Sequence, residues 1–151
     1  MVQGEKHMNI EKVIKQEQEF SFQHFTHEFG LKFGLEVINY IQSHQLKSVG
    51  IRIIYKDLLI FQYLMDGKKE DVWLKRKVRT VLESGHSSYY TFLHQDQYTD
   101  WIDNDCYAVG GGGFPIIENN KVVGAICVSG LKHDEDHQLI VDILRKLKEE
   151  L

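Results

Sequence analysis

The sequence predicts an α+β fold in which helices pack on an antiparallel sheet. Two pairs of β-rich runs are each separated by two residues, the spacing of a tight hairpin: 48–55 with 58–64, and 114–118 with 121–129. Helical patterns lie outside these pairs, so the order lacks the alternating βαβ units of a parallel sheet. At 151 residues the chain has the length of one domain, and we expect a single domain over residues 1–151.

Two amphipathic helices are expected before the first hairpin. Residues 10–20 carry apolar side chains at helical spacing, and in 26–43 an apolar residue recurs every four positions: Phe29, Phe33, Val37 and Ile41. Gly30 and Gly34 lie one turn apart in the second helix, although each costs about 1 kcal/mol relative to alanine. We therefore expect close packing there against a sheet or a subunit.

A basic helix is expected between the hairpins, over 70–84, with Val72, Leu74 or Lys75, Val78 and Leu82 at helical intervals and Gly85 as its C-cap. Residues 86–106 are polar and aromatic without a steady period, which allows only short helical pieces. The run 107–109 has the composition of a fifth strand, and a last helix begins near Asp134.

Residues 110–116 are the most unusual stretch, because they contain four of the twelve glycines and the only proline. Residues without a Cβ let backbone N–H groups approach another molecule closely, and proline fixes φ where the next strand begins. This pattern indicates a binding surface. The alternative is a tight turn with no ligand.

Composition narrows the class of protein. A net charge of −4 argues against nucleic-acid binding, which normally uses a basic face. No stretch approaches the roughly 18 apolar residues of a membrane span, and the polar segment 1–7 lacks the apolar core of a signal peptide. We therefore expect a cytoplasmic protein without a nucleic-acid or membrane partner, and we interpret Cys106 and Cys127 as free thiols.

Several motifs occur in an order that resembles the haem-degrading-domain superfamily, which includes the HbpS-like and GlcG-like proteins. The motifs are Trp73-x-x-Arg76-Lys77, Ser87-Ser88, Tyr107-x-x-Gly110-Gly111-Gly112-Gly113-Phe114-Pro115-Ile116 and Val128-Ser129-Gly130-Leu131-x-x-x-x-Asp136-His137. The resemblance covers about residues 15–150 and is greatest to a branch of largely uncharacterised cytosolic proteins. It implies a profilin-like, five-stranded antiparallel sheet flanked by helices, and a homo-oligomer built from dimers. It also raises haem as a ligand, since particular members act on haem, and leaves the cofactor of this branch open.

The motif residues supply the candidate ligand-binding set: Trp73, Arg76, Lys77, Ser87, Ser88, Tyr107, Gly111, Gly112, Gly113, Phe114, Pro115, Ser129, Gly130 and His137. Within it, the Arg76 and Lys77 side chains and the glycine amides have the chemistry to hold a small anion. The alternative interpretation is equally weighted: a solvated basic helix face, serines that cap the next helix, and glycines that only turn the chain.

His133 and His137 are four residues apart, the interval of a shared helical face. Asp134 is a natural N-cap that would leave His133 outside the helix, so we predict no metal site. Asp136 or His137 is expected to bind the loop at 129–131. The sharper alternative gives Asp136 and His137 an acid–base role in catalysis.

Three functions follow as hypotheses. The first is a binding module for a small anionic or planar ligand, held between the helix that carries Arg76 and Lys77 and the loop at 110–115. The second is an enzyme that uses Asp136 and His137, or haem-related chemistry. The third is a ring-like scaffold for protein partners.

Overall fold

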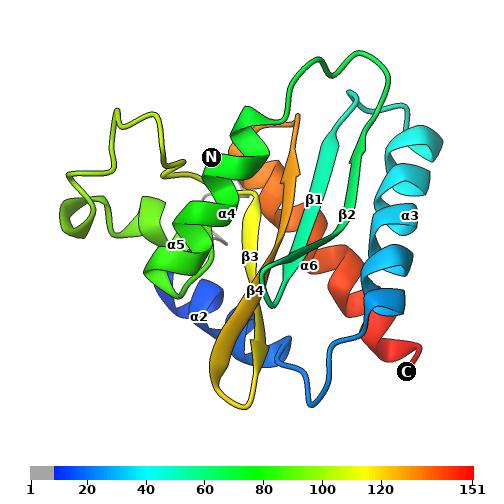
Figure 1. The fold of residues 1–151 in the computed structure, drawn as a ribbon, viewed down its shortest axis with the longest axis horizontal. Helices are drawn as coiled ribbons and strands as arrows, with labels where there is room; N and C mark the ends of the chain where they lie inside the picture. Colours follow the sequence, from blue (N-terminus) through cyan, green and yellow to red (C-terminus); the bar gives the residue numbers. More distant parts are fainter. Residues whose placement is uncertain (1–8) are drawn as a thin grey trace.

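The structure, a computed structural model, describes residues 9–151; the polar segment 1–7 discussed above lies outside them. The elements follow one another as in Figure 1: α2 (Ile10–Glu19), α3 (His27–Ser43), β1 (Gly50–Tyr55), β2 (Leu58–Leu64), α4 (Val72–Ser84), α5 (Ser88–Leu93), the 3-10 turn η1 (Gln95–Gln97), β3 (Gly113–Glu118), β4 (Lys121–Ser129) and α6 (His133–Glu149). The predicted α+β class is confirmed.

The sheet has the order β2-β1-β4-β3, and all neighbouring strands are antiparallel. Both predicted hairpins are present. Lys56 and Asp57 turn the first with φ of 50° and 67°, and Asn119 and Asn120 turn the second with φ of 51° and 64°. Two consecutive residues with positive φ match the right-handed twist of the flanking strands, as in a type I′ turn.

The predicted fifth strand at residues 107–109 is wrong: the sheet of the described residues has four strands. Side chains of α4 take up the backbone groups that a strand would offer to a neighbour. The Tyr107 carbonyl accepts from Arg76 Nε at 2.7 Å, and the Ala108 N–H donates to Thr80 Oγ1 at 2.9 Å. The segment is thus held against a helix.

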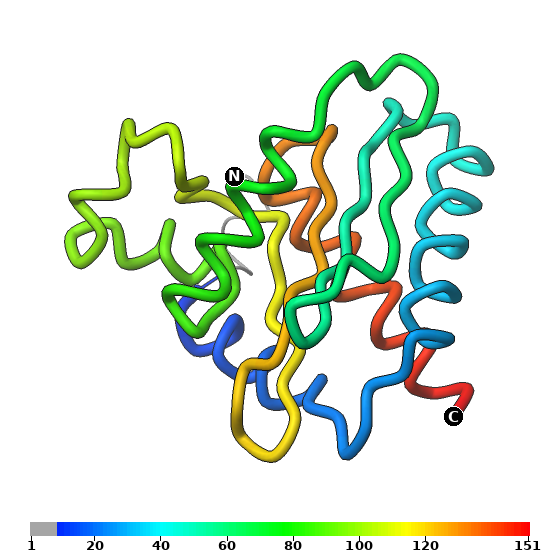
Figure 2. The backbone as a smooth tube through the Cα atoms, in the orientation of Figure 1, coloured from blue at the N-terminus to red at the C-terminus, as the bar shows by residue number. Residues whose placement is uncertain are grey.

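The helices form a layer on each face of the sheet (Figure 1). Helices α3 and α6 cover one face and α4 covers the other. The two faces alternate along β4, because Ile126 and Val128 belong to the large core under α3 and α6, whereas Ala125 and Cys127 pack against α4. Cys127 is a free thiol that is fully buried on the face covered by α4. In Figure 2 the chain between α5 and β3 loops out to one side, beyond α4.

The glycines of α3 lie where this helix meets strand β2. A Cβ on Gly34 would collide with the Phe61 ring, and one on Gly30 would lie 2.9 Å from Ile60 Cδ1. The expected close contact is therefore confirmed, and it is a contact with the sheet.

The buried face of α4 agrees only in part with the expected one: Leu74 is buried and Val78 packs against it, but the other two apolar positions are exposed. Val72 and Leu82 are 42% and 41% exposed, while the face that turns inward is Leu74, Lys77, Thr80 and Val81. A hydrophobic pattern counts lysine and threonine as polar, so it assigns this face to solvent. Gly85 ends the helix with φ of 74°, as predicted. Within 9–151, no helix has the length and apolar character that crossing a bilayer requires.

Candidate functional site

A cavity of about 360 Å³ lies between α4, the glycine loop (residues 110–113) with the two residues before it, and the connection from β4 to α6. Its lining combines the rings of a tryptophan and a phenylalanine, four polar or charged side chains and much backbone: Trp73, Lys77, Phe92, Ala108, Val109, Gly110, Gly111, Ser129, Gly130, Leu131, His133 and Asp136. A volume of this size suits a small organic ligand.

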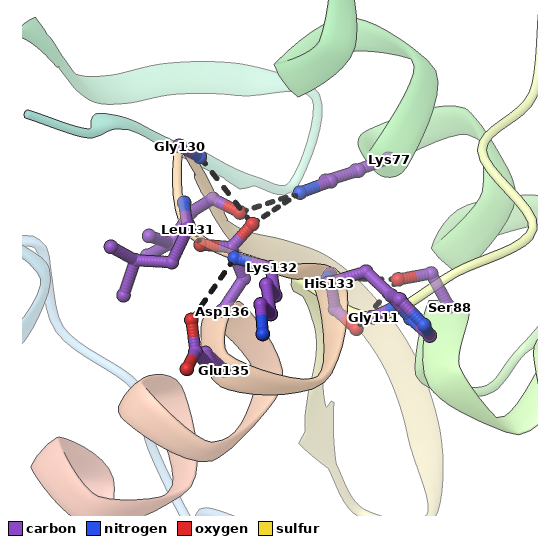
Figure 3. A network of polar contacts seen from close by, with 11 residues as sticks. Lys77, Ser88, Gly111, Gly130, Leu131, Lys132, His133, Glu135 and Asp136 are labelled. Atoms are coloured by element: carbon purple, nitrogen blue, oxygen red, sulfur yellow. Dashed lines mark hydrogen bonds and ion pairs between the residues drawn. The ribbon is translucent and has the colours of Figure 1, made fainter. Parts of the chain in front are cut away.

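Lys77 is the central charged residue of this cavity. Its side chain leaves α4 toward the end of β4 (Figure 3), and the residue is only 5% exposed. Lys77 Nζ donates to the Val128 carbonyl oxygen at 2.8 Å and to Asp136 Oδ2 at 3.2 Å. An ammonium group has three N–H donors, so among the described residues one donor has no protein acceptor.

Asp136 fixes the connection between β4 and α6. Its carboxylate accepts from the Leu131 N–H at 3.0 Å and from the Gly130 N–H at 3.4 Å, in addition to Lys77. The expected contact with the loop at 129–131 is thus confirmed for Asp136. Burial raises the pKa of Asp136, while Lys77 and the two N–H donors act in the opposite direction. The helix begins one residue earlier than predicted, at His133, with Lys132 as its N-cap.

The amides of the glycine loop are largely used within the protein. Gly110 N–H donates to the Ala108 carbonyl, Gly111 N–H to His133 Nδ1 at 3.0 Å and Gly113 N–H to Ser88 Oγ at 2.9 Å. These three N–H groups already have protein acceptors, so they are not the free donors that would be needed to hold a small anion.

The glycines of the loop are required for space instead. A Cβ on Gly111 would collide with the His133 carbonyl, and one on Gly112, whose φ is +119°, would collide with Lys77 Nζ. The absence of side chains thus lets the loop lie directly on the start of α6 and on the lysine. Glycine at these two positions allows this close packing, and Gly111 forms part of the cavity wall.

The two serines support this arrangement from α5. Ser87 Oγ accepts from the Tyr90 N–H and caps the helix, and Ser88 Oγ accepts from the Gly113 N–H; both serines are fully buried. Phe114 and Pro115 continue into β3 and are also buried, with the Phe114 ring 6.0 Å from that of Phe20. None of these four residues lines the cavity.

The two histidines one turn apart on α6 have different surroundings. His137 is fully buried behind the glycine loop, where its Nε2 donates to Gln16 Oε1 at 2.7 Å and its Nδ1 has no partner among the described residues. Burial, with a smaller contribution from His133, lowers the pKa of His137 to about 3, so the ring is neutral. It does not line the cavity.

His133 does line the cavity and is held by the glycine loop. Its Nδ1 accepts the Gly111 N–H, so the proton of the neutral ring lies on Nε2. Burial lowers the pKa of His133, which favours this neutral form. Within residues 9–151, no group of three His, Cys, Asp or Glu side chains is placed to hold a metal ion.

Arg76 faces a neighbouring groove. Its Nε donates to the Tyr107 carbonyl and its Nη2 to the Asn104 carbonyl at 3.3 Å, while its guanidinium carbon lies 3.9 Å from the Trp73 ring centre. The groove that it lines, of about 290 Å³, shares Trp73 and Phe92 with the main cavity. Arg76 therefore anchors the segment before the glycine loop.

The structure thus brings five of the predicted ligand-binding residues to one cavity and places others behind it. Trp73, Lys77, Gly111, Ser129 and Gly130 line it, together with the candidate acid–base residue Asp136. Sequence reasoning missed Phe92, which gave no periodic signal, and set His133 aside. The interval of four residues between the histidines was the signal that could have placed His133 on α6, but the expected N-cap at Asp134 argued against it; the structure has Lys132 as the N-cap.

Comparison with known proteins identifies the family. The family model described as "Haem degrading protein HbpS-like" matches residues 25–145. The chain belongs to this family. Two relatives of this HbpS-like chain, each named UPF0303 protein, cover nearly its full length. The relative from Psychromonas ingrahamii is 34% identical over 92% of each chain, and that from Streptomyces avermitilis is 31% identical over 97% of this chain and 94% of its own.

Solved structures share the fold of the HbpS-like chain. The crystal structure of Ybr137w superposes with a TM-score of 0.84 at 25% identity, covering 95% of this chain and 89% of Ybr137w. HbpS superposes with 0.67 at 15% identity, over 83% and 91%. The PduOC:Heme complex superposes with 0.63 at 12% identity, over 82% and 94%. At these last two identities the likeness establishes the fold alone.

Proposed function

We propose that this HbpS-like protein is a binding module for a small planar ligand that carries an acceptor oxygen. The observation that carries the proposal is Lys77, a buried ammonium group with one unused N–H at the wall of a cavity of about 360 Å³. A buried donor without an acceptor is costly, and a ligand oxygen would satisfy it.

The charge of the cavity favours a carbonyl oxygen over a full negative charge. Asp136 already neutralises Lys77 at 3.2 Å, and three of the four glycine amides have protein acceptors. A ligand carboxylate next to Lys77 would also approach the Asp136 carboxylate, and like charges repel strongly at short range in a poorly solvated site. Of the expected classes, anionic or planar, we therefore propose a planar carbonyl compound.

The cavity walls suit a flat ligand. Trp73, which is 48% exposed, and Phe92 both line the cavity and present aromatic rings on which another ring can stack. His133 Nε2–H supplies a second donor at the wall, because its Nδ1 is occupied by the Gly111 N–H. A ring between the aromatic walls, with its oxygen on Lys77 and His133, uses each of these groups.

Haem, which PduOC binds, does not fit this cavity. Haem iron is held by His, Cys, Met or Tyr, and the lining offers only His133. A histidine that ligates a metal usually donates its other N–H to an acceptor. Here His133 Nδ1 accepts an N–H instead, which leaves Nε2 protonated and unable to bind iron.

Assembly as a homo-oligomer built from dimers is part of the proposal, in a cytoplasmic setting. Its support is strand β2 at the edge of the sheet, where Leu58, Leu59 and Tyr63 are 57%, 51% and 46% exposed. Edge strands with apolar side chains are normally covered, since they otherwise invite aggregation.

Native mass spectrometry of the untagged protein from its own host tests ligand and assembly together. We expect a peak above the monomer mass with a retained small molecule. Lys77→Met should lose the retained mass, while Lys75→Met, a matched change at a side chain 59% exposed on the same helix, should keep it. A ligand-free wild-type protein, or equal retention by both variants, would contradict the proposal.

A further inference from the structure

The same lysine has the surroundings of a nucleophile. We propose that Lys77 forms an imine with aldehyde or ketone ligands, which is an activity and not only a contact. This inference rests on the proposed function, because it requires that the cavity place a carbonyl group at Lys77 Nζ. It makes Lys77 the catalytic residue and Asp136 its proton carrier.

The Lys77 side chain is hidden from bulk solvent but can be reached from the cavity. The residue is 5% exposed, yet it lines the cavity, and a Cβ on Gly112 would collide with its Nζ. Lysine amines in enclosed enzyme sites form Schiff bases with carbonyl substrates, and the cavity gives a carbonyl compound access to this one. The absence of a Cβ at Gly112 leaves room for Nζ itself, and a carbonyl carbon would approach from the cavity that Lys77 lines.

A proton acceptor lies in direct contact with the amine. Asp136 Oδ2 is 3.2 Å from Lys77 Nζ, and Asp136 is 2% exposed. The N–H groups of Leu131 and Gly130 hold this carboxylate in place, at 3.0 and 3.4 Å. Val128 holds the amine from the other side through its carbonyl, so Nζ and the carboxylate have a fixed relative position.

The reaction balances with these two residues and the ligand alone. Lys77 passes one ammonium proton to Asp136, and rotation about the Cε–Nζ bond turns the lone pair toward the carbonyl carbon. The N–C bond forms while the carbonyl π electrons move to the oxygen, and the cationic nitrogen of this adduct passes one proton to that oxygen, giving a neutral carbinolamine while Asp136 remains protonated. Asp136 then protonates the hydroxyl group, which leaves as water, and the protonated imine that results keeps the Asp136 carboxylate as its counter-ion. No oxidant or reductant takes part.

The charge pattern favours the imine once it has formed. The ammonium ion and the protonated imine carry the same charge, so the neutralisation by Asp136 is unchanged. Lys75, two positions earlier on α4, is 59% exposed at its side chain and forms an ion pair at 3.6 Å with Asp71, whose side chain is 29% exposed. It is a matched reference lysine on the same helix.

Reductive trapping tests the proposal. The protein is incubated with benzaldehyde and sodium cyanoborohydride, and peptide mass spectrometry locates the benzyl group. We expect Lys77 to be modified faster than any exposed lysine, by about tenfold or more. Lys77→Arg should abolish the benzyl modification at position 77, whereas Lys75→Arg should leave the modification of Lys77 unchanged. Asp136→Asn should slow it by roughly 100-fold, the lower range for loss of an acid–base group.

Binding of benzamide separates the two proposals, because it offers the same ring and carbonyl but cannot form an imine. Benzamide binding without trapping at Lys77 would overturn the imine and leave the proposed function standing. Absence of both would overturn both. Equal trapping at Lys75 and Lys77 would overturn the inference. Trapping at Lys77 that is unchanged in Asp136→Asn would overturn the role of Asp136. The wild-type peptide map decides the main point even where a variant fails to fold.

Discussion

The buried ion pair between Lys77 and Asp136 predicts a large stability effect when one partner is removed. Nζ and Oδ2 are 3.2 Å apart, and the side chains are 7% and 2% exposed, so water cannot replace a missing partner. Asp136→Asn leaves a buried ammonium ion without its counter-charge. We expect a loss of about 3–5 kcal/mol in the free energy of unfolding, the range measured for broken buried pairs.

Lys77→Met should cost less, about 1–3 kcal/mol, because the remaining carboxylate keeps two backbone N–H donors. The raised pKa of Asp136 also shows that it accepts a proton more readily than an exposed aspartate. In the double variant no unpaired charge is left. Its loss should therefore be smaller than the sum of the two single losses, by about 2 kcal/mol or more.

Urea unfolding followed by circular dichroism measures all three free energies, with the midpoint and slope compared for each variant. The exposed pair Arg79 and Glu83, at 52% and 44% exposure, is the matched control and should show coupling of no more than about 0.5 kcal/mol. The reasoning is refuted if Asp136→Asn costs less than about 1 kcal/mol, or if the coupling of the buried pair equals that of the exposed one.

Two further predictions concern the glycine loop and the buried histidine. Gly111→Ala should lower the free energy of unfolding by roughly 1–3 kcal/mol, because its Cβ collides with the His133 carbonyl. Thermal unfolding measures this loss, and the control Gly110→Ala, whose Cβ meets only ordinary contacts, should unfold near the wild-type temperature. Equal losses of stability in the two variants would contradict the steric argument. His137 takes up a proton near pH 6.5 when unfolded but near pH 3 when folded, so stability should fall by up to about 1.4 kcal/mol per pH unit as the pH is lowered through this window. Urea titrations at pH values from 7 to 4 should show a smaller dependence of the free energy of unfolding on pH in His137→Phe than in wild type. The same dependence in both proteins would contradict this assignment to His137.

Much of the fold could be predicted because its signals are local. The hairpins follow from two β-rich runs around Lys56-Asp57 and Asn119-Asn120, and the contact of α3 with the sheet follows from Gly30 and Gly34. The fifth strand could not be excluded in this way. Residues 107–109 have the composition of a strand, but Arg76 and Thr80 on a distant helix take their hydrogen bonds.

The sequence indicated several residues that line the cavity, but not the contacts that they make. Lys77 belongs to a basic run that looks solvated in sequence, and only tertiary packing against β4 shows that it alone turns inward while Lys75 remains exposed. Likewise, the loop at 110–113 indicates close approach of the backbone. Whether a ligand or the protein accepts its N–H groups depends on the positions of Ser88 and His133.

The most direct test of the central claim is the affinity of benzamide for wild-type protein and for Lys77→Met, measured by isothermal titration calorimetry. A hydrogen bond from a charged donor contributes about 1.5–3 kcal/mol. The variant should therefore bind about 10- to 150-fold more weakly, while Lys75→Met should bind like wild type. Equal affinity of wild type and Lys77→Met would show that the buried lysine does not hold the ligand, and would contradict the account.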